Sequence, residues 1–211
     1  VPPPPGGSVL SAPTNLHHTS SGGISLAASF LCGGADPGIP GWVVADCQQM
    51  PSFDDGVTTL VLKRSSDGHF AVAVLFKSGT HLQQRYWAEE PAGGTWAGVK
   101  VVLGDFHFDD AAEVWIGYRY EGTGHYLDID VLDPRPDGSI FLGGLQGLDH
   151  GVAHLHPGGA TIQLSVFGPS DPGCCASHVL RREITFSGQQ WWRNIGTTYA
   201  VAAAPALTSD L

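Results

Sequence analysis

The sequence predicts a mainly β fold, with one antiparallel, disulfide-stapled domain and few short helices. Gly (29 residues) and Pro (15) are frequent and charged residues make up only 14% of the 211 residues, so long amphipathic helices are not expected. Apolar residues reach 42%, which suffices for a buried core. Short β-branched and aromatic runs alternate with turn residues along most of the chain. These three observations together predict antiparallel strands joined by tight turns.

The first predicted hairpin lies in VTTLVLKRSSDGHFAVAVLF, where two strands meet at Ser66, Asp67 and Gly68. Asp-Gly supplies the positive φ that a tight hairpin needs. THLQQRYW and GVKVVLGDF follow as two further strands. Two earlier segments, 25–32 (SLAASFLC) and 45–50 (ADCQQM), could form short helices, which would make the fold α+β.

A second hairpin is predicted in EVWIGYRYEGTGHYLDIDVL, with its turn at Glu121–Gly124. Successive side chains of a strand point to opposite sides, so the second arm has one polar and one apolar face. The polar face carries Tyr126, Asp128 and Asp130, and the apolar face carries Leu127, Ile129 and Val131. PDGSIFLGGL, with another Asp-Gly turn, ATIQLSVF, HVLRREITF and QQWWRNI complete the series of strands.

The two ends of the chain differ in composition from the expected domain, residues 24–201. Residues 1–23 are rich in Pro, Gly and Ser, which predicts a linker, and residues 202–211 are expected to form a flexible tail. The chain starts VPPPPGGS without a Met, which is typical of a mature or trimmed segment. The chain contains no run of 18 apolar residues, so the sequence predicts no transmembrane helix.

The charge balance argues against two classes of binding partner. The net charge is −10 with ten Lys and Arg residues, and these form no basic cluster. Nucleic acids and anionic membrane surfaces both need clustered Lys or Arg, so neither is an expected partner.

The four cysteines are expected to form disulfide staples. Cys174 and Cys175 are adjacent, which suits neither the paired spacing of a zinc site nor a CxxC redox motif. A bond between neighbours is strained, because a trans peptide holds their Cα atoms about 3.8 Å apart whereas disulfides span about 4.4–6.8 Å. Alternatively, each of them pairs with Cys32 or Cys47. Of the three connectivities we favour Cys32–Cys47 with Cys174–Cys175, in an oxidising compartment.

Two clusters could hold a metal ion. In GDFHFDDAAEVWIG, positions 1, 5 and 9 of a calcium-loop pattern are Asp105, Asp109 and Glu113, which supply the oxygen ligands that Ca²⁺ prefers. Position 3 is His107 and position 6, normally Gly, is Asp110, so the alternative is an ordinary turn with solvated carboxylates.

The second cluster, in HGVAHLHPGG, contains His150, His154 and His156. His154 and His156 are two residues apart and would share one face of a strand, where a nearby carboxylate could complete a Zn²⁺ site. A loop with chance histidine pairs is the alternative.

Enzyme signatures are absent, since the sequence contains no GxSxG elbow, HExxH motif or P-loop. Aromatic residues are the more prominent feature, and exposed aromatic rows bind sugars or proteins. The candidate ligand-binding aromatics are Trp115, Tyr118, Tyr120, Tyr126, Trp191 and Trp192. Each could equally belong to the core, except that one of the adjacent Trp191 and Trp192 should be exposed.

Three stretches resemble the LppP/LprE-type envelope lipoproteins of actinobacteria and related bacterial envelope proteins. DPGCCASHVLRREITFSGQQW resembles their closing segment, with Ala176 in place of the usual Pro. VAVLFKSGTHLQ and LGDFHFDDAAEVWIGYRYEGTGHYLDIDVL are similar to two further stretches, although the glycines of the second are replaced. The resemblance covers residues 45–195 with gaps. It implies a lipid-anchored extracytoplasmic protein without established activity, and the anchoring Cys is not in this chain.

We therefore expect a secreted cell-envelope binding protein rather than an enzyme, with no cofactor other than Ca²⁺. The expected partner is a cell-wall glycan, a lipid or an envelope protein, with the membrane reached only through a lipid anchor. The alternatives are a Zn²⁺-dependent hydrolase at the histidines and a structural module stabilised by Ca²⁺.

Overall fold

A computed structural model describes residues 6–12, 23–34, 36–50, 56–91, 96–106, 108–134, 140–187 and 190–211. The chain forms antiparallel strands in three sheets, and this confirms the predicted mainly β fold. The only helix among the described residues is a 3₁₀ turn, Val201–Ala203. None of the described helical structure is long and apolar enough to cross a membrane.

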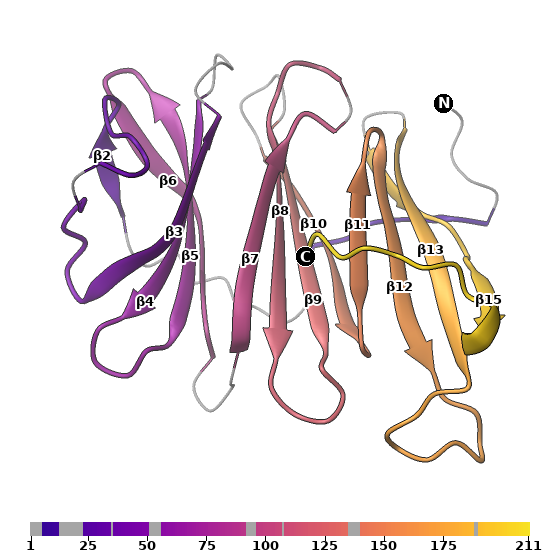
Figure 1. Cartoon of the computed structure of the whole chain (residues 1–211). Coiled ribbons are helices and arrows are strands. Elements are labelled where there is room, and N and C mark those ends of the chain that lie inside the picture. Colours follow the sequence, from indigo (N-terminus) through magenta and orange to yellow (C-terminus); the bar gives the residue numbers. More distant parts are fainter. Residues whose placement is uncertain are drawn as a thin grey trace.

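Consecutive strands pair with one another in each sheet (Figure 1). The first sheet has the order β2 (Ser25–Ala27), β6 (His81–Glu89), β5 (Phe70–Ser78), β4 (Val57–Arg64) and β3 (Trp42–Met50). The second has the order β10 (Ile140–Leu148), β9 (Leu127–Pro134), β8 (Glu113–Tyr120) and β7 (Trp96–Gly104). The third has the order β1 (Ser8–Val9), β14 (Gln190–Arg193), β13 (His178–Ser187), β12 (Gly159–Val166) and β11 (Val152–His156), with β15 (Thr197–Ala200) also on β13. A four-stranded antiparallel meander is thus the common unit of all three sheets.

The three sheets stand side by side, with their faces packed together (Figure 1). Alternate residues of the middle sheet therefore enter two different cores. Trp115 packs toward the third sheet, whereas Val114 and Ile116 pack toward the first. The expected apolar face of β9, residues Leu127 to Val131, lies in the core shared with the third sheet.

The outer face of the first sheet has a third core, which the chain preceding β3 covers. Cys32 and Cys47 form a disulfide there, with Cα atoms 5.5 Å apart, and this confirms the predicted bridge. The loop that it closes spans 15 residues, for which chain entropy predicts a stabilisation of about 3 kcal/mol. The covering segment is therefore tied to β3 covalently.

The predicted hairpins are correct, whereas the two predicted helices are wrong. β4 and β5 meet at the Ser66–Gly68 turn, with φ +78° at Gly68, and β8 and β9 meet at the predicted Glu121–Gly124 turn. Segment 25–32 contains β2, and 45–50 is the second half of β3. Pairing with a neighbouring strand, as between Cys47 and Leu60, outweighs the local helical preference. The second Asp-Gly turn, at 137–138, lies outside the described residues.

The described ends of the chain also differ from the linker and tail that composition predicted. β1 pairs with β14, and Leu10 is 3% exposed in the core between the second and third sheets. The tail crosses the third sheet (yellow in Figure 1), and Leu211 is 2% exposed in the same core. Composition is a property of a whole segment, so it does not reveal a single apolar side chain that docks.

Candidate functional site

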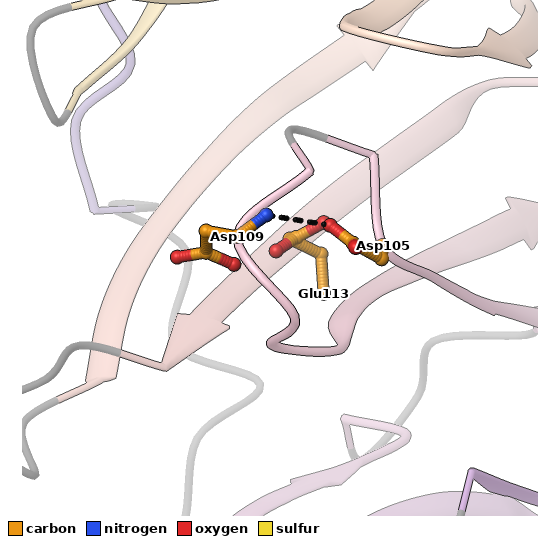
Figure 2. Close-up of side chains that lie close together, drawn as sticks. All are labelled: Asp105, Asp109 and Glu113. Carbon is orange, nitrogen blue, oxygen red and sulfur yellow. Dashed lines mark hydrogen bonds between the residues drawn. The ribbon is translucent and has the colours of Figure 1, made fainter. Parts of the chain in front are cut away.

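The acidic loop between β7 and β8 brings together the three carboxylates that the calcium-loop pattern predicted (Figure 2). Asp105, Asp109 and Glu113 each have an oxygen within 4.8 Å of the other two. Among the described residues this is the only group of three or more His, Cys, Asp or Glu side chains so arranged. His107, at position 3 of the pattern, lies outside the described residues.

Hydrogen bonds within the acidic loop fix its shape. Asp105 Oδ1 accepts the backbone N–H of Asp109 at 3.1 Å, drawn as the dashed line in Figure 2, and its Oδ2 accepts that of Asp110 at 3.3 Å. Asp109 Oδ1 accepts the N–H of Ala111 at 2.9 Å. The turn is thus folded around the carboxylates, as is usual where Asp side chains bond nearby backbone groups.

Glu113 begins β8 and is fully buried. Its Oε2 accepts the backbone N–H of Phe106 at 2.5 Å, which closes the base of the loop. Burying a carboxylate is unfavourable unless it is hydrogen-bonded and its charge is compensated. A cation at the loop would supply that compensation.

The backbone at Asp110 has φ +65°. Calcium loops of this spacing use Gly at position 6 because the turn there is sharp. Asp is among the residues that tolerate the left-handed region. The replacement of Gly by Asp110 therefore leaves the backbone in a left-handed conformation, and the three oxygen ligands remain suited to Ca²⁺.

The three histidines proposed for zinc do not converge. His154 and His156 share one face of β11, as predicted, with ring centroids 6.3 Å apart. His154 Nδ1 lies 2.9 Å from Asp210 Oδ2, and His156 Nε2 lies 3.5 Å from Glu183 Oε2.

His150, in contrast, lies in the turn before β11, where its ring contacts His125 and its Nδ1 bonds Asp149. The prediction that all three histidines form one zinc site is therefore wrong, because the turn directs His150 to a different partner.

Three of the six predicted ligand-binding aromatics are core residues, and Tyr120 is partly buried against the core. Trp115, Tyr118 and Trp191 are fully buried. Tyr126 is 44% exposed. The prediction that one of two adjacent tryptophans is exposed holds in part, because Trp192 is partly exposed.

Buried tyrosines and aspartates between the first two sheets form a network that sequence reasoning missed. Tyr86 Oη donates to Asp130 Oδ2 at 2.5 Å and lies 2.6 Å from Tyr118 Oη. Tyr120 Oη donates to Asp128 Oδ2 at 3.0 Å. Burial raises the pKa of Tyr86, Tyr118 and Tyr120 well above the usual tyrosine value. The predicted polar face of β9 was the available signal, although it did not identify the partner strand.

Cys174 and Cys175 carry free, exposed thiols, so the predicted bridge between them is not formed. Their trans peptide keeps the Cα atoms nearer than an unstrained disulfide needs. Asp171 shapes the surrounding loop by accepting the backbone N–H groups of Gly168 and Ser177 at 2.6 and 2.8 Å. Hydrogen bonding with Cys174 raises the pKa of the Cys175 thiol.

A cavity of about 480 Å³ opens on the covered outer face of the first sheet. Trp42 and Trp87 line it, with their rings edge to face at 5.4 Å. Glu89 lies on its wall and forms an ion pair with Arg64, whose guanidinium stands 5.1 Å from the Trp42 ring centroid. The sequence did not indicate Trp42 or this cavity, because the segments that enclose the cavity are far apart in the chain.

No protein-family model matches this chain, and comparison with the curated proteins and with the solved structures found no match.

Proposed function

We propose that the protein is an extracytoplasmic module of a bacterial cell envelope that binds a cell-wall glycan. The observation that carries the proposal is the cavity beside Trp42 and Trp87. Its volume of about 480 Å³ lies within the range of small-ligand sites, which combine aromatic walls with a few polar groups. The envelope assignment rests on the Cys32–Cys47 disulfide, since such bonds persist in oxidising compartments, and on the resemblance to envelope lipoproteins.

Of the three expected ligand classes, a glycan fits the lining best. The partly exposed indole of Trp42 offers a large, rigid surface for the C–H face of a sugar ring, and Trp87, which is 5% exposed, packs behind it. Glu89, which lines the cavity and is ion-paired with Arg64, offers acceptors to sugar hydroxyls, and the ion pair brings charge to the cavity wall. A lipid chain would leave these charges desolvated, which is unfavourable.

The test is a titration of the full chain with soluble cell-wall saccharide fragments, followed by tryptophan fluorescence and calorimetry. We expect saturable binding that Trp42→Ala and Glu89→Gln each weaken. Trp192→Ala is the matched control, because Trp192 is also partly exposed but belongs to the third sheet. Equal binding by Trp42→Ala and the wild type would rule out this cavity, and binding of lipids instead of saccharides would change the ligand class.

A second role is favoured by the acidic loop, namely stabilisation of the module by Ca²⁺. Oxygens bound to Ca²⁺ at about 2.3–2.6 Å lie at most about 5 Å apart. The three carboxylate oxygens, within 4.8 Å of one another, already meet this condition. The acidic loop leads into β8, an inner strand of the middle sheet, so a bound ion would stabilise the centre of the fold.

Thermal unfolding with and without Ca²⁺ tests this second role. Linkage predicts a gain of about 2.7 kcal/mol when the free Ca²⁺ concentration is 100 times the Kd. Asp105→Asn and Asp109→Asn should reduce the gain, whereas Asp46→Asn, at an exposed residue of β3, should keep it. A melting temperature that does not change with Ca²⁺ in the wild type would refute the role.

A further inference from the structure

Two turns meet at the end of the second sheet opposite the acidic loop, and each contributes one histidine. The β8–β9 turn carries His125, whose backbone N–H donates to the Gly122 carbonyl oxygen at 3.3 Å. The β10–β11 turn carries His150, whose backbone N–H donates to the Gly124 carbonyl oxygen at 2.9 Å. The second bond ties the turns together, so the relative positions of the two histidines are set by the backbone.

Both histidines have backbone conformations that L-residues rarely adopt. φ is +41° at His125 and +46° at His150. Within the described ranges, the only other non-glycine residues with positive φ are Phe108 and Asp110, both in the acidic loop. Residues held in sparsely populated regions cluster at functional sites, because the surrounding structure must maintain them. The two turns thus share this property with the candidate Ca²⁺ loop.

The two imidazoles are spaced for a shared ion. Their ring centroids lie 5.6 Å apart, with an interplanar angle of 65°. A tetrahedral ion with metal–nitrogen bonds of about 2.0–2.1 Å places two imidazole centroids about 5 Å apart. A small side-chain rotation would therefore bring both rings onto one ion.

Asp149 orients the second imidazole. Its Oδ1 is bonded to His150 Nδ1, which directs Nε2 away from the carboxylate. Metal-binding histidines typically have such a partner, since a carboxylate on the other nitrogen fixes the ring and increases its basicity. His125 is exposed, and no hydrogen bond to its ring nitrogens occurs within the described part of the chain.

A cavity of about 430 Å³ adjoins the pair. Residues next to both histidines line it, including Tyr126 and Asp149, and Glu121 adds a carboxylate from the same hairpin. Only the acidic loop brings three ligand atoms within 4.8 Å among the described residues, so the histidine pair supplies two protein ligands in this conformation. Water or an external ligand would take the remaining coordination positions.

We propose that His125 and His150 bind one divalent transition-metal ion of the class that prefers imidazole, Zn²⁺ or Cu²⁺, at the mouth of this cavity. Imidazole nitrogens suit these ions, whereas Ca²⁺ prefers the oxygens of the acidic loop. The site is thus chemically distinct from the Ca²⁺ loop and independent of glycan binding.

Titration calorimetry of the full chain with Zn²⁺, in buffer that contains Ca²⁺, tests the proposal. We expect one bound ion per chain, and His125→Asn and His150→Asn should each weaken binding more than about tenfold. Asn is chosen because it tolerates positive φ, so the turns should keep their backbone. The matched control is the double variant His154→Asn/His156→Asn, which removes the other close histidine pair and should bind as the wild type does.

Electron paramagnetic resonance with Cu²⁺ gives a second readout, with hyperfine coupling to two imidazole nitrogens expected in the wild type and to one in each single variant. Circular dichroism verifies that the variants fold. Unchanged binding in His125→Asn and His150→Asn would overturn the proposal. Loss of binding only in Cys174→Ser/Cys175→Ser would assign the ion to the exposed thiols instead, and absence of binding to folded wild type would also refute it.

Discussion

The hydroxyl groups of Tyr86 and Tyr118 lie 2.6 Å apart at the buried junction of the first and second sheets. Tyr86 also donates to Asp130 Oδ2 at 2.5 Å, so a strand of the first sheet is hydrogen-bonded to two strands of the second. Burial is the main cause that raises the pKa of both tyrosines well above the usual value. The contact between these sheets therefore requires both phenols to keep their protons.

This contact predicts a loss of stability at alkaline pH. Tyrosines in the unfolded chain ionise near pH 10, whereas the folded pKa values of Tyr86 and Tyr118 are higher. Their stabilising contribution is thus complete below about pH 10 and declines as pH rises toward the folded values. Urea unfolding between about pH 7 and pH 11 should show this decline.

The variant Tyr86→Phe/Tyr118→Phe should show a shallower decline above pH 10. At neutral pH it should be less stable by about 1–3 kcal/mol, because buried Asp130 loses a donor. Tyr199→Phe, at a partly exposed tyrosine of β15, is the matched control. A double variant with the slope of the wild type would show that other groups cause the alkaline loss.

Burial of the Glu113 carboxylate leads to a separate prediction about Ca²⁺ binding by the acidic loop. Glu113→Gln keeps an oxygen that can accept the Phe106 N–H but removes one charge from the three clustered carboxylates. We expect the Ca²⁺-free protein to keep or gain stability, while the increase in melting temperature on adding Ca²⁺ becomes smaller. Calorimetric melts with and without Ca²⁺ measure both quantities. An undiminished Ca²⁺ response would place the ion elsewhere.

Local features of this fold were predictable from the sequence. The Asp67–Gly68 turn, the Glu121–Gly124 turn and the alternation of β9 each depend on a few adjacent residues. The convergence of Asp105, Asp109 and Glu113 was predictable for the same reason, because one short loop contains all three.

Contacts between distant segments were not predictable. Tyr86 and Asp130 are 44 positions apart, and their contact depends on which face of one sheet packs against the next. His125 and His150 meet because a backbone bond joins two turns, which no spacing rule indicates. Segment 45–50 was wrongly predicted as helical because its strand conformation comes from pairing with β4.

Substitution of the two cysteine pairs should affect stability differently. Cys32→Ala/Cys47→Ala should lower the free energy of unfolding by about 3 kcal/mol, because the loop between them is no longer closed in the unfolded state. Cys174→Ser/Cys175→Ser should leave stability nearly unchanged, since both thiols are exposed.

Alkylation of the unreduced protein followed by mass spectrometry checks the pairing. The reagent should label only Cys174 and Cys175, and the raised pKa of Cys175 should keep its thiol protonated and slow its labelling at neutral pH. Labelling of Cys32 or Cys47 without reductant would contradict the disulfide assignment.

The docked tail gives the last prediction, because Leu211 fits against a glycine of the middle sheet. A Cβ atom added at Gly117 would lie 3.0 Å from Leu211 Cβ and 3.3 Å from Leu127 Cδ1. Arg119 fixes the same segment by donating to the Leu211 carbonyl and to Ser209 Oγ. Gly117→Ala should therefore overpack this position and cost about 1–3 kcal/mol.

Leu211→Gly, which also removes the Cβ atom that faces Gly117, should cost at least the about 2–5 kcal/mol of a Leu→Ala change by leaving a cavity. The double variant Gly117→Ala/Leu211→Gly should be more stable than the sum of the single effects predicts, since removing the Leu211 Cβ atom gives the new methyl group room. Urea unfolding of the wild type, the two single variants and the double variant completes a double-mutant cycle. A coupling free energy of about 0.5–3 kcal/mol is expected for residues in contact. Strict additivity would mean that the tail does not dock against Gly117 in solution.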